Sequence, residues 1–163
     1  MKRVEKLLKG IVQVERYICC GLLMIMLAVC FLSVIMRYAF NSPLVWSEEV
    51  ILSALIWFGF LCISIGVKTD EHIAIEGVYN KLPLKAQKCC DVFRHVLLLA
   101  FSVFMTIEGY KIFQINLLKD LPATGWNQGI QYFPMVVGGA LMTVFSLCNL
   151  IAVFLPKDKE GQA

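Results

Sequence analysis

The sequence YICCGLLMIMLAVCFLSVIM, residues 17–36, decides the fold. It carries no charge, and as an α-helix it would extend about 30 Å, which matches the hydrocarbon thickness of a bilayer. The stretch is longer than the roughly 7–15 apolar residues of a secretory signal peptide, and Arg37, Tyr38 and Ala39 do not form a small-residue cleavage site. We therefore expect a retained first membrane span and not a cleaved leader.

Three further apolar stretches have the length of a span. Residues 50–67 and 132–155 lack charged side chains, whereas residues 96–118 contain Glu108 and Lys111. The chain is 59% hydrophobic and 17% charged, against about 25% charged residues in a typical soluble domain. We expect an all-α membrane protein with four transmembrane helices, whose 163 residues form one integral membrane domain.

The distribution of Lys and Arg predicts how the chain is oriented. Five of these residues precede the first span and five lie in residues 68–95, whereas residues 37–49 and 119–131 hold one each. Short loops rich in Lys and Arg stay on the cytoplasmic side of a bacterial inner membrane, so both termini are expected in the cytoplasm. The formal net charge of +3 is small and dispersed, which favours membrane lipid over nucleic acid as the partner.

The first outer loop, RYAFNSPLVWSEE at residues 37–49, is dense in anchoring residues. Trp46 suits the interface between headgroups and acyl chains, and Ser47 is expected to cap the second helix. The charged residues of the loop have both signs: Arg37, Glu48 and Glu49. These features fit either a plain aromatic belt before a capped helix or a docking surface for another subunit.

The inner connection, residues 70–94, contains an amphipathic segment. Its apolar residues recur at helical spacing: Ile75, Val78, Tyr79 and Leu82. Such a stripe is typical of an interfacial helix that lies flat on the membrane, and it would equally suit the surface of a partner subunit. His72 precedes the stripe, and we interpret it as a hydrogen-bonding residue and not as a metal ligand or proton relay.

The outer half of the third span and the loop after it hold the remaining polar features. Glu108 and Lys111 are one helical turn apart, and at their depth they need either each other or a contact with another subunit. Residues 121–134 are too rich in Pro, Gly and amide side chains for a lipid-facing helix, so we place them outside with Trp126 as an anchor. Gly138 begins a face of small residues that another helix could approach closely.

Taken together, these residues resemble the small membrane subunit, called DctQ-like, of tripartite ATP-independent periplasmic (TRAP) transporters. The resemblance extends over nearly the whole chain and is most specific in the block from Arg37 to Glu49. The motifs that carry it are Arg37-Tyr38, Phe40-Asn41, Pro43-Leu44, Trp46-Ser47-Glu48-Glu49, Trp57, Phe60-Leu61, His72-Ile73, Trp126, Tyr132, Pro134 and Gly138.

The resemblance implies a heterocomplex in the inner membrane of a bacterium. A large permease subunit would carry sodium and an organic acid, and a periplasmic substrate-binding protein would deliver the acid. This chain would be a scaffold without catalytic residues, substrate site, metal or cofactor. The residues expected at subunit interfaces are Arg37, Asn41, Pro43, Trp46, Glu48, Glu49, Trp57, His72, Ile75, Tyr79, Glu108, Lys111, Trp126 and Gly138.

Two other functions stay open on the residues alone. A self-sufficient small multidrug exporter would need an acidic group in a substrate cavity, for which Glu108 is the only acidic candidate within a span. A haem-binding four-helix redox subunit would need paired axial ligands, for which the chain offers His72 and His95. Transport by the chain alone would favour the exporter, and a visible absorption spectrum would reveal haem.

Overall fold

The computed structural model describes residues 2–69 and 84–154 of the chain. This part forms the α-helices α1 (Lys2–Ala39), α2 (Val45–Thr69), α4 (Leu84–Asn116) and α5 (Gly129–Phe154). Each helix contains a stretch that is long and apolar enough to cross a membrane. The prediction of an all-α protein with four long apolar helices is confirmed. The cytoplasmic termini and the interfacial helix stay predictions, and Ile75 to Leu82 lie outside the described residues.

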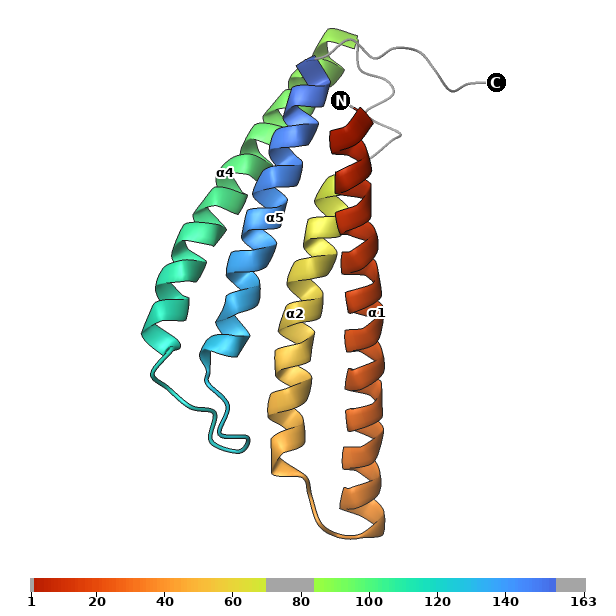
Figure 1. Ribbon diagram of the computed structural model, residues 1–163, viewed down its shortest axis with the longest axis vertical. Helices are drawn as coiled ribbons and strands as arrows, with labels where there is room; N and C mark the ends of the chain where they lie inside the picture. The colour runs from red at the N-terminus through yellow and green to blue at the C-terminus, as the bar shows by residue number, and fades with distance from the viewer. Residues whose placement is uncertain (1, 70–83, 155–163) are drawn as a thin grey trace, which may run out of the picture.

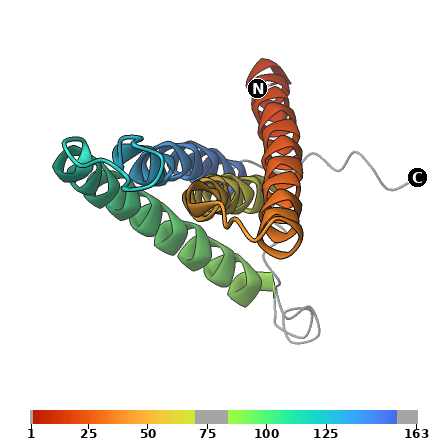
Figure 2. The same cartoon turned by 90° about the horizontal axis from the view of Figure 1, so that it is seen from below.

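The helices run alternately up and down and pack in a row (Figure 1). α2 packs on both α1 and α5, and α4 packs on α5. Seen from below, α2 and α5 lie between α1 and α4 (Figure 2). The start of α1 and the end of α5 lie at one end of the molecule, which we call the terminal end. The opposite end, with the connections 40–44 and 117–128, is the loop end.

Two helices extend well beyond the expected spans at the terminal end. α1 begins at Lys2, although the first expected span starts at residue 17. Leu8 and Val12 are buried, whereas Lys9 and Arg16 are exposed, so the charges lie on a different face of the same helix. α4 likewise begins at Leu84, well before residue 96. Charged residues therefore end the apolar run without ending the helix.

An apolar cluster joins three helices at the terminal end. Phe145 of α5 is fully buried, and Val67 of α2 is 1% exposed. Leu8, Val12 and Met142 complete the cluster. Leu8 and Val12 come from the part of α1 that precedes the expected span, so this extension of α1 is packed into the fold.

The turn between α1 and α2 is closed by local backbone contacts. Asn41 takes a left-handed conformation with φ of 49°, which Asn tolerates better than most residues. The Ser42 amide donates to the Met36 carbonyl at 3.1 Å and closes the end of α1. α2 begins at Val45, and the Ser47 hydroxyl lies 2.7 Å from the Leu44 carbonyl oxygen. The expectation that Ser47 caps α2 is wrong, because Ser47 sits inside the first turn and donates to a carbonyl.

Candidate functional site

One exposed surface surrounds the α1–α2 turn at the loop end. It contains five of the residues predicted at subunit interfaces: Arg37, Asn41, Pro43, Trp46 and Glu48. Arg37 lies in the last turn of α1, where the negative end of the helix dipole favours a cation. The Trp46 side chain is 38% exposed at the start of α2. We call these five residues the turn surface; they offer an aromatic ring and charges of both signs to a headgroup region or a partner.

Glu49 is half-buried and lies against the connection between α4 and α5. Its carboxylate accepts hydrogen bonds from the backbone amides of Ala123, at 2.9 Å, and Thr124, at 2.8 Å. The Thr124 hydroxyl donates to the same carboxylate at 2.7 Å. Charge-assisted hydrogen bonds of this kind are stronger than those between neutral groups. Glu49 therefore fastens the outer loop to α2, and its carboxylate is engaged within the chain.

Trp57 donates a hydrogen bond to a carbonyl group that Pro134 leaves without its usual helical donor. A proline inside a helix has no amide hydrogen, so the carbonyl four residues earlier loses its usual donor. That carbonyl belongs to Ile130, and the Trp57 indole nitrogen donates to it at 3.2 Å. The Trp57 ring also stacks in a tilted arrangement on Phe133, with the ring centroids 5.9 Å apart. Trp57 therefore joins α2 to the first turns of α5.

Two glycines let α5 approach its neighbours closely. A Cβ atom on Gly138 would lie 2.8 Å from the Cβ atom of Phe60 in α2. A Cβ atom on Gly139 would lie 2.6 Å from the Thr106 hydroxyl of α4 and 3.1 Å from the Thr106 amide nitrogen. Small residues at such crossings are typical of helix packing in membranes. The small-residue face expected at Gly138 thus serves contacts within this chain.

Glu108 and Lys111 form an ion pair on α4. The Lys111 nitrogen lies 2.7 Å from the nearer Glu108 oxygen. The side chains of Lys111 and Glu108 are 60% and 36% exposed, respectively. The two residues therefore make one hydrogen bond to each other, and both side chains remain accessible at the surface of the bundle.

Trp126 is held on the outer loop by backbone contacts and is 48% exposed. The Leu121 amide donates to the Trp126 carbonyl at 2.7 Å, and Gly125 takes a left-handed φ of 68°. Asn127 caps the start of α5, because its side-chain oxygen accepts from the Gly129 amide at 2.7 Å. The loop is thus a defined structure that presents an indole ring. The other predicted contact residues, His72, Ile75 and Tyr79, lie outside the described residues.

Glu15 is a buried polar residue that the sequence analysis missed. It is only 3% exposed, and one of its carboxylate oxygens accepts from the Ser64 hydroxyl of α2 at 2.8 Å. The other carboxylate oxygen has no hydrogen-bond partner in the described part of the chain. The signal was present, because Glu15 continues the stripe of buried residues Leu8 and Val12 at helical spacing. The thiols of Cys19 and Cys62, 3.8 Å apart, continue the same α1–α2 contact.

Within residues 2–69 and 84–154, no three His, Cys, Asp or Glu side chains come together as a metal site would require. The described spans are also continuous helices, whereas midplane sites of secondary transporters are typically built from interrupted helices.

Comparisons with known proteins identify the family of the chain. Residues 10–155 match the family of tripartite ATP-independent periplasmic transporters, DctQ component. A TRAP transporter small permease protein from Haemophilus influenzae is 32% identical over 83% of this chain and 84% of its own length. The sialic acid TRAP transporter small permease protein SiaQ of Vibrio cholerae is 27% identical over 93% of this chain and 89% of its own length.

A longer relative is informative in a different way. The sialic acid TRAP transporter permease protein SiaT of Haemophilus influenzae is 30% identical over 69% of this chain, yet the match covers only 18% of that protein. Most of that relative therefore lies outside the region that this chain matches. The family is one of transporter permeases and not of enzymes. The chain, a multi-pass membrane protein, belongs to the DctQ family and is a small permease subunit of a TRAP transporter.

Proposed function

We propose that this small permease subunit is a rigid scaffold for a large permease subunit. The large subunit would take up organic acids together with sodium, after a periplasmic substrate-binding protein has delivered them. The observation that carries this proposal is the sialic acid permease relative, in which a region like this chain makes up only 18% of one much longer permease protein. The relatives named for sialic acid support an organic acid as the substrate class.

The packing of the helices supports a scaffold role. α5 is tied to α2 at Gly138 and Trp57 and to α4 at Gly139, through contacts that leave little space for sliding. Glu49 fastens the outer loop to α2. A part that resists deformation gives a moving transport domain a fixed surface to work against. The small subunit would accordingly contribute packing and orientation, while the large subunit holds the substrate.

The proposed orientation places the loop end in the periplasm and both termini in the cytoplasm of a bacterium. It rests on the excess of Lys and Arg in residues 2–16 and 68–95. Reporter fusions test it: alkaline phosphatase should be active when fused after residue 122 and inactive when fused after residue 155. The reverse pattern would exclude this orientation.

The scaffold role is tested by expressing the tagged chain with and without its large permease subunit. We expect the tagged chain to retain the large subunit through purification, and proteoliposomes to take up substrate only when both subunits and the binding protein are present. Uptake by the small subunit alone, lost in Glu108→Gln, would instead support an exporter. The position of Glu108 argues against that reading, because its side chain is ion-paired and 36% exposed on the surface of α4.

The turn surface is the proposed outer contact with the large subunit. The double substitution Trp46→Ala and Glu48→Ala should reduce the amount of large subunit that co-purifies, because it removes the ring and one charge. Tyr17→Ala with Arg16→Ala is the matched control, since it also removes one exposed ring and one exposed charge from α1, outside the turn surface. Unchanged co-purification in the double variant would remove the turn surface from the interface.

A further inference from the structure

A patch of four polar residues lies on α4, outside the contact with α5. The patch consists of Glu108, Tyr110, Lys111 and Gln114. Besides the Glu108–Lys111 ion pair, the Gln114 amide nitrogen lies 2.9 Å from the Tyr110 hydroxyl oxygen. The Tyr110 side chain is 52% exposed, and Gln114 is exposed as well. We call these four residues the polar patch.

The polar patch interrupts an apolar surface. Phe104 and Ile107 precede it with 59% and 51% of their area exposed, and Ile115 follows it with 65% exposed. Lys111 has three N–H donors, of which Glu108 takes one, and Gln114 has unused donor and acceptor capacity. Hydrocarbon cannot supply the missing hydrogen bonds, and polar side chains at membrane depth usually face a protein partner or a water-filled cavity.

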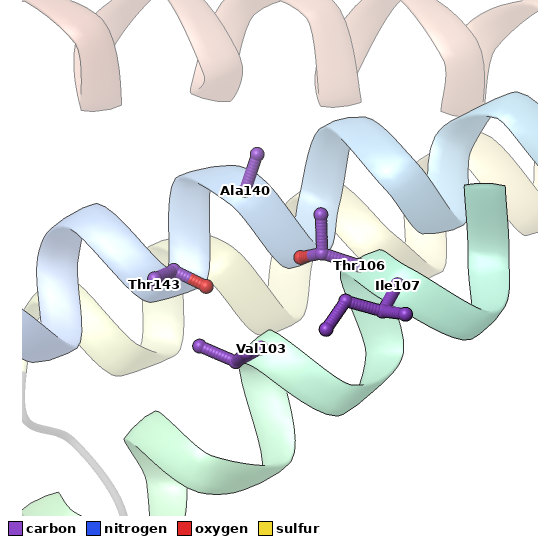
Figure 3. Close-up of a pocket in the computed structure, with 5 residues that line it drawn as sticks. All are labelled: Val103, Thr106, Ile107, Ala140 and Thr143. Carbon is purple, nitrogen blue, oxygen red and sulfur yellow. The ribbon is translucent and has the colours of Figure 1, made fainter.

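A shallow groove between α4 and α5 lies beside the polar patch. It has a volume of about 260 Å³ and is lined by Val103, Thr106 and Ile107 of α4 and by Ala140 and Thr143 of α5 (Figure 3). The two threonine hydroxyls are already bound inside the helices: Thr106 to the Ser102 carbonyl and Thr143 to the Gly139 carbonyl, each at 2.8 Å. The groove therefore offers methyl groups and suits a large apolar side chain.

The groove and the polar patch form one continuous surface. Val103, Ile107, Tyr110 and Gln114 are spaced by four, three and four residues, which places them along one face of α4. Lys111 borders the same face. From Val103 to Gln114 this face extends roughly 16 Å along the helix, which is the length of about three helical turns. A single helix of another protein lying against α4 and α5 would contact both features at once.

We propose that this face binds one membrane-spanning helix of the large permease subunit. That helix places a large apolar side chain in the groove and a hydrogen-bond acceptor, such as a carboxylate or an amide oxygen, opposite Lys111. An acyl chain could fill the groove but could not form hydrogen bonds with the polar patch. A protein helix can do both and is therefore the better occupant. This inference rests on the proposed function, because it identifies where the large subunit contacts the scaffold.

Photo-crosslinking maps this contact without weakening the fold. A benzophenone amino acid is introduced at Ile107, and in a second sample at Ile25 of α1, in the complex with the large subunit in native membranes. The two isoleucines are equally exposed, at 51% each. Irradiation should yield roughly tenfold more large-subunit adduct from position 107 than from position 25, because only position 107 lies on the face assigned to the large subunit. Adducts of position 107 with lipid only, with a second copy of this chain, or at the yield of position 25 would overturn the proposal.

A substitution test measures the same contact by affinity. Ala140→Phe fills the groove, and Lys111→Ala removes the charge; together they should lower the retained large subunit roughly tenfold. Ala28→Phe is the matched control, because Ala28 is also exposed and lies on α1. Unchanged retention in the Ala140→Phe and Lys111→Ala variant, with normal helix content, would overturn the assigned face. If the unsubstituted chain itself retains no large subunit, the proposed function fails; retention without the position-107 adduct rejects only this face.

Discussion

The contact of α2 with α5 and its contact with α1 are built differently. α5 approaches α2 at the level of the backbone, through Gly138 and through the hydrogen bond from Trp57 to a carbonyl. α1 contacts α2 mainly through side chains, including Ser33 with Ser47 and Glu15 with Ser64. In the apolar stretch of α5, 33% of the residues are buried, against 6% in that of α1. The difference teaches that α5 is the most deeply packed helix of this bundle and that α1 lies at its periphery.

The largest expected effect comes from adding bulk at the α2–α5 crossing. Gly138→Leu should lower the free energy of unfolding by about 3 kcal/mol, because its Cβ atom would overlap Phe60. Gly21→Leu is the control on α1, where a Cβ atom meets nothing within 4 Å. Unfolding of the purified subunit in SDS, followed by circular dichroism, measures both. Equal stability of the two variants would refute the contrast between α5 and α1.

The buried carboxylate of α1 should have the next largest effect. Glu15→Ala leaves the Ser64 hydroxyl without its acceptor and opens a small cavity, at a cost of about 2 kcal/mol. Glu15→Gln keeps the acceptor oxygen and should lose less than half as much stability. The same SDS titration measures both variants. If Glu15→Gln instead loses as much stability as Glu15→Ala, the charge of Glu15, and not its hydrogen bond to Ser64, stabilises the α1–α2 contact.

A double-mutant cycle tests the link between Trp57 and Pro134. Trp57→Phe leaves the Ile130 carbonyl without a donor and should cost about 1 kcal/mol. In the Pro134→Ala background the new amide of residue 134 can donate to that carbonyl, so the same Trp57 substitution should cost measurably less. The four proteins are compared by their free energies of unfolding. Strict additivity would show that Trp57 acts by packing alone.

The smallest effect is expected at the loop end. Glu49→Gln weakens the hydrogen bonds that hold residues 123 and 124, so their amides should exchange with deuterium roughly tenfold faster while the helices stay protected. Glu48→Gln removes an equal charge from an exposed position next door and should leave this exchange unchanged. Hydrogen exchange followed by mass spectrometry resolves the two. Equal exchange in both variants would mean that Glu49 does not fasten the loop.

The sequence predicted the helices better than it predicted their contacts. Apolar length alone indicated four spans, and the block from Arg37 to Glu49 indicated the family. Helix bounds were harder: α1 starts at Lys2 because its charged residues can point away from Leu8 and Val12. The roles of single residues were hardest, because they depend on distant partners. Glu49 binds residues 74 and 75 positions away, and a local pattern carries no information about such a pair.

The length of α1 has a consequence for how temperature acts on the molecule. Its 38 residues extend roughly 57 Å, whereas a bilayer with headgroups is about 40–45 Å thick. In the proposed orientation, the turns with Leu8 and Val12, beside exposed Lys9 and Arg16, reach the aqueous boundary. Packing these residues removes apolar surface from water, which gives a heat-capacity change that packing within lipid lacks. The stabilisation from such burial weakens on cooling, so cooling should loosen this end of the molecule first.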